Sequence, residues 1–231
     1  MPFSIFRLRT LRGADVVGLL IGMSLFAMFF FLSLYMQQVL GYDALKTGFA
    51  YLPLALNIIA SAGVASQLVT RVGFKPTLIA GLLLLAGGMV WFAQVSPTGS
   101  YVSDILFPSL IVAWGLGLAF VPVTVAAVTG TRPDEAGLAS GLINTAQQVG
   151  GALGLAVLAA VANGRTSDVI ASGVRNPAVA LTEGFQDAFL VGAGFALLGA
   201  LLAAVMISSR DSREHAEAAR RGDAEPAGAV A

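Results

Sequence analysis

The stretch AGLASGLINTAQQVGGALGLAV, residues 136–157, is long and apolar enough to cross a bilayer, yet it carries polar side chains and several glycines. A helix turns about 100° per residue, so one sector of this segment holds Ser140, Asn144, Gln147, Gln148 and Gly151. The opposite face is made of Leu, Ile, Val and Ala. Because an amide finds no hydrogen-bond partner in hydrocarbon, the polar sector is expected to face other helices or a water-filled cavity.

The composition of the whole chain also indicates that most of it lies in lipid. Of its 231 residues, 57% are hydrophobic and 11% are charged, and the mean hydropathy is +0.83, whereas soluble domains carry about 25% charged residues. The charges lie between long apolar runs, which indicates an integral membrane protein. Cysteine is absent, so disulfides, thiolate metal sites and cysteine nucleophiles are excluded. No basic patch suggests a nucleic-acid partner.

Six apolar stretches are long enough to span a membrane, since about 20 residues of helix cross the hydrocarbon. The predicted spans are residues 16–40, 47–69, 77–95, 105–128, 139–162 and 185–207. The first run is too long for the core of a signal peptide and lacks a small-x-small cleavage site at its end, so it is expected to be retained. The predicted fold is therefore all-α, one polytopic bundle of six transmembrane helices within residues 15–208. A faint three-plus-three repeat is visible in the turns that precede corresponding spans.

The distribution of the thirteen Lys and Arg residues predicts the orientation. With a cytoplasmic N-terminus, ten of them lie inside, and the outer loops keep only Lys46, Arg165 and Arg175. Both termini are therefore expected in the cytoplasm of a cell-membrane protein, with a short cytoplasmic segment at 1–14. The polar, mixed-charge residues 209–231 are predicted to form a disordered cytoplasmic tail.

The amides of the opening stretch allow two interpretations. Asn144 and Gln148 either hydrogen-bond to neighbouring helices or line a substrate path, and one helix can do both. Gly150 and Gly154 have the spacing that lets a second backbone approach closely, and Gly151 lies beside them.

Other spans offer further candidate residues. On span 16–40, Phe26, Phe30 and Gln37 share a sector, which suits an apolar or cationic aromatic compound, although a Phe-rich helix also commonly faces lipid. On span 47–69, Asn57 aligns with Ser61 one turn on. The remaining candidates concern movement rather than binding, because glycine and proline suit a helix that bends while the bundle rocks: Gly117 and Pro122.

Ionisable residues are missing from the middle of every predicted span. Asp15 and Asp104 lie where helices are expected to begin, and the histidine, His215, lies in the tail. A proton-coupling site normally needs an ionisable group inside the membrane, so the sequence shows none. No nucleophile–base pair, carboxylate pair or metal-ligand cluster occurs within reach of the bilayer, so we predict neither an enzyme, a metal site nor a cofactor.

Four segments resemble a known family, the major facilitator superfamily, and within it the drug:proton antiporters with fourteen transmembrane helices, the EmrB/QacA type. They are FFFLSLYMQQVLGYDALKTGFAYLPLAL (29–56), RVGFKP (71–76), GLGLAFVPVTVAAV (115–128) and DEAGLASGLINTAQQVGGALGLAVLA (134–159). The resemblance implies that the six spans are the C-terminal bundle of such a transporter. It also implies proton-coupled export of hydrophobic or cationic drug-like compounds by alternating access.

The same resemblance places the proton-coupling carboxylates in the N-terminal half of family members. We therefore expect this chain to need an N-terminal bundle, or a second copy of itself, before it can enclose a substrate. The alternative is a truncated or scaffold membrane protein without transport activity of its own, which the lack of ionisable residues inside the spans favours.

Overall fold

The structure, a computed structural model, describes residues 8–221, and these residues form helices joined by turns and loops. Six helices have the length and apolar composition to cross a membrane, which confirms the predicted all-α fold and its six spans. The elements are α1 (Arg9–Leu34) with a π-helical turn (Tyr35–Val39), α2 (Ala44–Ala50), α3 (Leu52–Val72), α4 (Phe74–Phe92), a π-helical turn (Tyr101–Leu106), α5 (Phe107–Val128), a 3-10 turn (Pro133–Glu135), α6 (Ala136–Ala171), α7 (Pro177–Met206) and α8 (Ser209–Arg221).

The helices extend beyond the apolar runs that predicted them. α1 begins at Arg9 instead of residue 16, α6 continues to Ala171 instead of 162, and α7 begins at Pro177 instead of 185. Hydropathy marks only the part of a helix that lies in hydrocarbon, whereas hydrogen bonds and caps decide where the helix stops. The start of α7 is an example, because the side chain of Asn176 accepts a hydrogen bond from the Ala178 backbone and Pro177 occupies the first helical position.

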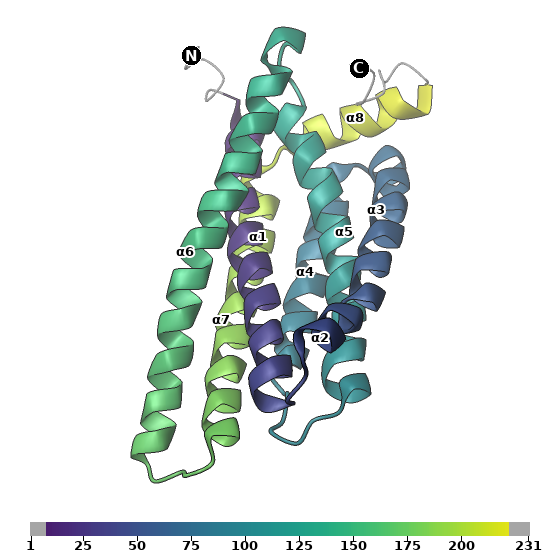
Figure 1. Ribbon diagram of the computed structural model, residues 1–231. Coiled ribbons are helices and arrows are strands. Elements are labelled where there is room, and N and C mark those ends of the chain that lie inside the picture. The colour runs from purple at the N-terminus through teal and green to yellow at the C-terminus, as the bar shows by residue number, and fades with distance from the viewer. Residues whose placement is uncertain (1–7, 222–231) are drawn as a thin grey trace.

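Helices α1 and α5 lie in the middle of the bundle, with α6 and α3 on its two flanks and α4 and α7 behind (Figure 1). The packing has an internal symmetry. Contacts of α1 with α6 and α7 correspond to contacts of α5 with α3 and α4, and α4 packs against α7. Exchanging the first three spans with the last three reproduces these contacts, as expected of a three-plus-three repeat, although α6 packs on α7 more extensively than α3 packs on α4.

Two clusters of buried side chains hold the centre together. One surrounds Phe31, Phe92 and Phe189 near the end where α1 finishes, and the rings of Phe92 and Phe189 stack with centroids 5.3 Å apart. The other surrounds Leu78 and Val123 near the opposite end. Lipid is as apolar as these side chains, so their close packing, rather than escape from water, is what stabilises the bundle.

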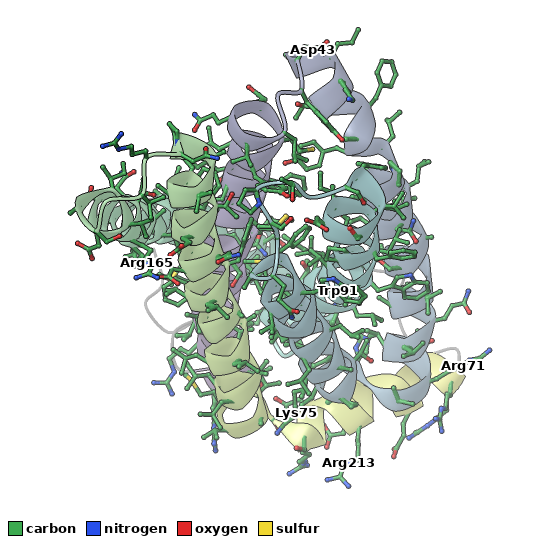
Figure 2. All side chains as sticks on the ribbon, turned by 90° about the horizontal axis from the view of Figure 1, so that it is seen from below. Asp43, Arg71, Lys75, Trp91, Arg165 and Arg213 are labelled. Atoms are coloured by element: carbon green, nitrogen blue, oxygen red, sulfur yellow. The ribbon has the colours of Figure 1, made fainter. Side chains whose placement is uncertain are left out.

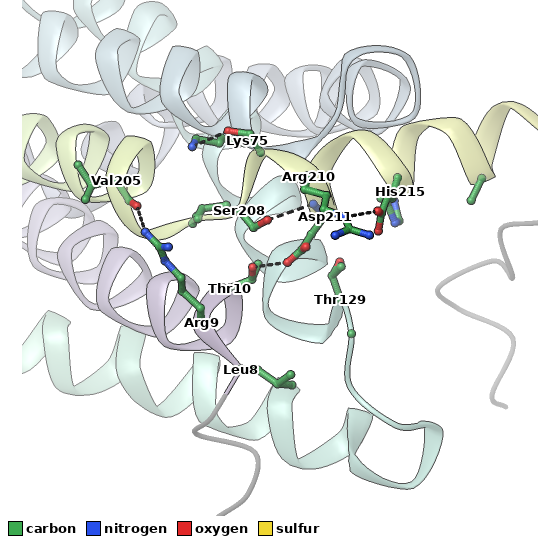
Figure 3. A pocket seen from close by; sticks show the side chains of 15 residues that line it. Leu8, Arg9, Thr10, Lys75, Thr129, Val205, Ser208, Arg210, Asp211 and His215 are labelled. Carbon is green, nitrogen blue, oxygen red and sulfur yellow. Dashed lines mark hydrogen bonds and ion pairs between the residues drawn. The ribbon is translucent and has the colours of Figure 1, made fainter.

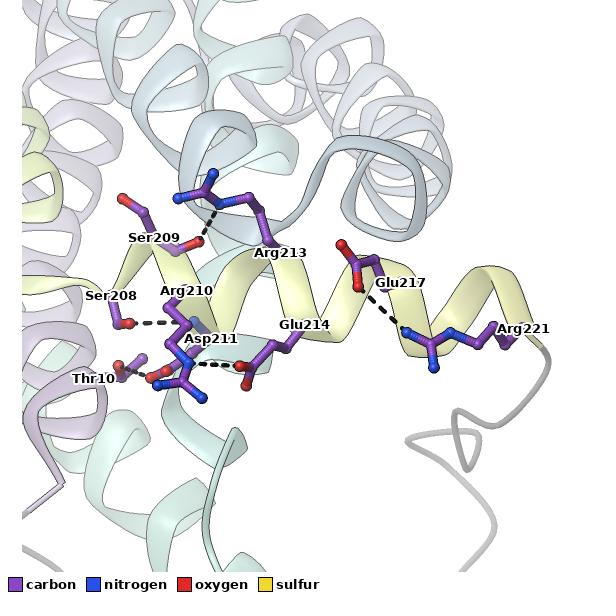
Figure 4. A network of polar contacts seen from close by, with 9 residues as sticks. All are labelled: Thr10, Ser208, Ser209, Arg210, Asp211, Arg213, Glu214, Glu217 and Arg221. Carbon is purple, nitrogen blue, oxygen red and sulfur yellow. Dashed lines mark hydrogen bonds and ion pairs between the residues drawn. The ribbon is translucent and has the colours of Figure 1, made fainter.

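Residues 209–221 correct the prediction of a disordered tail, because they form helix α8 across the end of the bundle where α1 begins (Figure 1). Ala, Glu and Arg favour helix, and two pairs at i,i+4 support it: Arg210 with Glu214 and Glu217 with Arg221. These pairs, together with the contacts of Thr10 and the serines, are drawn in Figure 4. The rest of the predicted tail, residues 222–231, lies outside the described residues.

Helix α8 packs against the turn between α3 and α4 and forms a hydrogen bond with it. The hydroxyl of Ser212 accepts a hydrogen bond from the Lys75 backbone at 3.0 Å, and the rings of His215 and Phe74 meet edge to face. The turn itself passes through Gly73, whose φ of +95° suits glycine and whose missing side chain leaves room for Ser212. Arg71, Lys75 and Arg213 gather around α8 (Figure 2).

Candidate functional site

The polar sector of α6 lies on the surface of the bundle. Asn144, Thr145 and Gln148 are exposed, and Gln147 is half-buried against α1. Asn144 donates from Nδ2 to the Ser140 carbonyl at 3.0 Å, and the Thr145 hydroxyl donates to the carbonyl one turn earlier. Such bonds within a helix keep part of the hydrogen-bonding capacity occupied and leave the rest of each amide open to another molecule.

Beside that sector, α6 packs on α1 through glycines. A Cβ at Gly150 would overlap the backbone of Leu19, and one at Gly154 would overlap the backbone of Met23. From the other side, a Cβ at Gly22 would overlap the Gln147 backbone. The two helices therefore touch along their main chains, the kind of contact that small residues allow between membrane helices.

The aromatic candidates of α1 adjoin this contact. Phe26 is 43% exposed and its ring lies over Gly151, one turn from Gln147 and Gln148. Phe30, one turn further, is 42% exposed and meets Phe31 edge to face at 5.3 Å. The structure thus brings Phe26 close to the amide sector of α6, and Phe30 follows it along α1.

Gln37 does not belong to this group. It is exposed in the π-helical turn that ends α1, eleven residues after Phe26, which is about 16 Å along a helix. It therefore lies at the rim of the bundle, away from the amides of α6.

The candidates on α3 separate from each other. Asn57 is half-buried and donates to the Pro53 carbonyl at 2.9 Å. Ser61 is fully buried, and its hydroxyl lies within hydrogen-bond distance of the carbonyls of Ala113 on α5 and Ile58 on α3, 2.9 Å from each. Ser61 also fills the space that Gly117 leaves open. It lies inside the α3–α5 contact and not on the exposed face of α3.

Pro122 and Gly117 are both buried within α5. Gly117 lets α3 approach, whereas Pro122 removes one backbone donor from the middle of the helix. Both lie on the helix that contacts α3, α4 and α1, so a bend there would move three neighbours at once.

Sequence reasoning missed Asp15, which it placed at the beginning of a helix. Because α1 begins at Arg9, Asp15 lies inside a membrane-spanning helix. Its Oδ1 is buried and has no hydrogen-bond partner among residues 8–221. Gly18, one turn further along α1, touches Ile143 of α6, so Asp15 borders the α1–α6 contact. The available signal was Arg9 and Arg12, long basic side chains that allow a helix to begin upstream of its apolar part.

This region exposes polar and aromatic groups side by side. Exposed amides, hydroxyls and two phenylalanine rings on α1 and α6 can hold an apolar or cationic aromatic molecule without a fixed hydrogen-bond pattern. Within residues 8–221 no group of three His, Cys, Asp or Glu side chains comes together as a metal site would require.

Comparison with known proteins gives a family and a set of relatives. Residues 3–155 match the family described as Major Facilitator Superfamily. The puromycin resistance protein pur8 of Streptomyces alboniger is 34% identical over 216 residues, which cover 91% of this chain and 43% of that protein. The cephamycin export protein CmcT of Amycolatopsis lactamdurans is 35% identical over 207 residues, 89% of this chain and 41% of that protein. The chain thus spans less than half the length of these relatives.

Solved structures support the fold. A bacterial homologue of the human drug peptide transporters PepT1 and PepT2 matches 93% of this chain and 49% of its own, with a TM-score of 0.70. At 16% identity, that likeness concerns the fold alone.

Proposed function

Because the chain belongs to the Major Facilitator Superfamily, we propose that it forms the C-terminal six-helix bundle of a drug efflux transporter. The proposed substrates are hydrophobic or cationic drug-like compounds, moved outward by alternating access. The names of the relatives support this, since they describe resistance to one antibiotic and export of another. Both belong to proteins more than twice as long as the matched segment, so the activity is proposed for an assembly and not for this bundle alone.

The observation that carries the proposal is the exposure of the polar sector of α6. Asn144 and Gln148 lie on the outside of a membrane bundle, where hydrocarbon offers them no partner. A polar face of this kind is expected to meet water in a central cavity or the surface of a second bundle. We infer that this second bundle is an N-terminal one, and that a second copy of the chain is the alternative.

Within the assembly we assign the substrate path to the exposed candidates Phe26, Phe30, Asn144 and Gln148 and to the half-buried Asn57. Ser61 is assigned to packing, since its hydroxyl is engaged at the α3–α5 contact. Gly117 and Pro122 are proposed to let α5 bend as the bundles rock, and Gly150, Gly151 and Gly154 to keep α6 close to α1.

We propose a cell-membrane location with the α8 end of the bundle in the cytoplasm. Arg71, Lys75 and Arg213 gather at that end, which fits the preference of basic residues for the cytoplasmic side (Figure 2). Proton coupling is part of the proposal as well. Asp15 supports it, as an acidic side chain inside a span with one oxygen buried and unpaired.

The test is transport of a lipophilic cation by reconstituted protein. The full chain is placed in liposomes together with an N-terminal bundle from one of the relatives, and efflux of tetraphenylphosphonium is followed under an imposed pH gradient. We expect Asn144→Leu with Gln148→Leu to reduce efflux about tenfold, as loss of two polar contacts to a bound cation would. Asn163→Leu, an exposed amide elsewhere on α6, is the matched control.

Absence of cation movement in every pairing, with both proteins folded and inserted, would reject the transporter proposal. The scaffold alternative would then remain. Efflux that is insensitive to the Asn144 and Gln148 changes would keep the transporter but remove the assigned path.

A further inference from the structure

A hollow of about 900 Å³ lies at the α8 end of the bundle (Figure 3). Its walls come from the beginnings of α1 and α4, the ends of α5 and α7, and one side of α8. Polar and apolar side chains share the lining, among them Arg9, Lys75, Ser209, Leu8, Val205 and Ile207. No candidate residue of the substrate path takes part in it.

Two cations of the hollow have no carboxylate within ion-pair distance among the described residues. Arg9 donates to the Val205 carbonyl at 2.8 Å, and the Lys75 ammonium donates to the Ser209 hydroxyl at 2.9 Å. A guanidinium has five N–H donors and an ammonium has three, so both keep donors for a further acceptor. Their like charges disfavour each other across the hollow, and an anion between them would relieve that repulsion.

The other charges of the hollow are already engaged. Asp211 accepts a hydrogen bond from the Thr10 hydroxyl at 2.6 Å, and Glu214 pairs with Arg210 at 2.6 Å. Burial lowers the pKa of His215, so this imidazole is neutral at pH 7. Three cations and two carboxylates line the hollow, which leaves a single positive charge. That charge matches the single negative charge of a phosphodiester.

The hollow continues into an apolar stripe on α7. Val205 forms part of its wall and is 60% exposed. Leu201 and Leu197 follow at intervals of one turn along the same face, 60% and 49% exposed. A polar recess that opens onto an exposed row of aliphatic side chains fits a molecule with a charged head and an apolar chain, and a soluble anion would use only the recess.

We propose that this hollow binds the phosphodiester head group of an anionic phospholipid, with an acyl chain along the α7 stripe. Arg9 and Lys75 bind the phosphate oxygens, and Ser209 orients the Lys75 ammonium. Basic recesses between membrane helices and near their ends suit such head groups, because Lys and Arg side chains at the membrane surface attract anionic lipids. The site needs only that the bundle sits in a membrane, so it stands independently of the transport proposal.

The experiment is native mass spectrometry of the full chain released from detergent after titration with phosphatidylglycerol or phosphatidylcholine. We expect the wild-type chain to retain one phosphatidylglycerol in preference to phosphatidylcholine. Arg9→Gln with Lys75→Gln should weaken that retention about 25-fold, since each basic side chain near a lipid surface contributes about fivefold. The matched control is Arg12→Gln with Arg213→Gln, which removes two cations that do not line the hollow.

Two further measurements distinguish a bound lipid from a bound soluble phosphate ester. Glycerophosphoglycerol, which has the phosphodiester head group but no acyl chain, should compete weakly. Leu201→Ser should weaken phosphatidylglycerol retention while leaving competition by glycerophosphoglycerol unaffected. Equal retention of both lipids, equal loss in the control pair, or competition by glycerophosphoglycerol as strong as by lipid would each overturn the proposal. If the double variant fails to fold, Lys75→Gln alone tests it, with an expected fivefold loss and with wild-type retention as the contrary result.

Discussion

Helices α1 and α5 differ from α3 and α6 in how much of each is covered. In the most apolar stretches of the segments Arg9–Val39 and Tyr101–Val128, 56% and 61% of the residues are buried. The corresponding shares are 22% for Ala44–Val72 and 28% for Ala136–Ala171. The central pair is packed on several sides, whereas α3 packs mainly on α5, α6 packs on α1 and α7, and each leaves much of its surface open (Figure 1).

The difference shows that each flanking helix packs through small residues on one edge and leaves a face open, which is polar on α6 and apolar on α3. On α6, Gly150 and Gly154 touch α1 while Asn144 and Gln148 stay exposed. On α3, Ser61 is buried against α5 while Leu56 and Ile59 are exposed. A flanking helix therefore has one edge committed to its own bundle and one face available to lipid or a second bundle.

The largest effect on stability is expected when a large side chain is placed on the edge of α6 that packs against α1. Gly150→Leu would force α6 away from the Leu19 backbone, whereas Gly141→Leu on the same helix places its Cβ where nothing lies within 4 Å. Overpacking of this kind costs about 3 kcal/mol, which should appear as a lower thermal unfolding midpoint in detergent. Equal midpoints for the two variants would mean that the α1–α6 contact is not close in solution.

A substitution of Asp15 tests the same α1–α6 contact, but this change is expected to stabilise the bundle. The Oδ1 atom of Asp15 is buried without a partner, and an amide is less costly than a carboxylate in that position. Asp15→Asn should therefore stabilise the isolated bundle by about 2 kcal/mol in thermal unfolding at pH 7. Asp168→Asn, at an exposed place near the end of α6, should change nothing. A loss of stability in Asp15→Asn would show that the carboxylate has a partner.

The committed edge of α3 should respond more weakly. Ser61→Ala removes the hydrogen bond to the Ala113 carbonyl and is expected to destabilise the bundle by about 1 kcal/mol. Ser66→Ala, exposed on the same helix, provides the baseline in the same unfolding measurement. If both variants behave alike, packing at Gly117 and not the hydrogen bond holds α3 to α5.

The smallest effect on stability belongs to the open face. Asn144→Leu should leave the unfolding midpoint of the isolated chain within about 0.5 kcal/mol of wild type, because that side chain bonds only to its own helix. Circular dichroism melting in detergent checks this. A large loss of stability would place Asn144 among the packing residues and would contradict the difference between the packed edge and the open face of α6.

The sequence by itself determined the number of spans and the polar sector of α6. Both are local properties, because apolar length decides whether a segment crosses the membrane and the 3.6-residue period decides which side chains share a face. Residues 136–157 were enough to predict that Ser140, Asn144, Gln148 and Gly151 share one sector of a helix whose opposite face is apolar.

The tertiary structure alone decided which neighbours those faces meet. Ser61 and Asn57 lie one turn apart, yet α5 covers the first and leaves the second half-exposed. Asp15 lies within α1, six residues after its beginning, because helix hydrogen bonds extend α1 back to Arg9, and α8 is held in place by the α3–α4 turn. Each outcome depends on contacts between segments far apart in the chain, and the pattern within one segment carries no information about the surface that will pack against it.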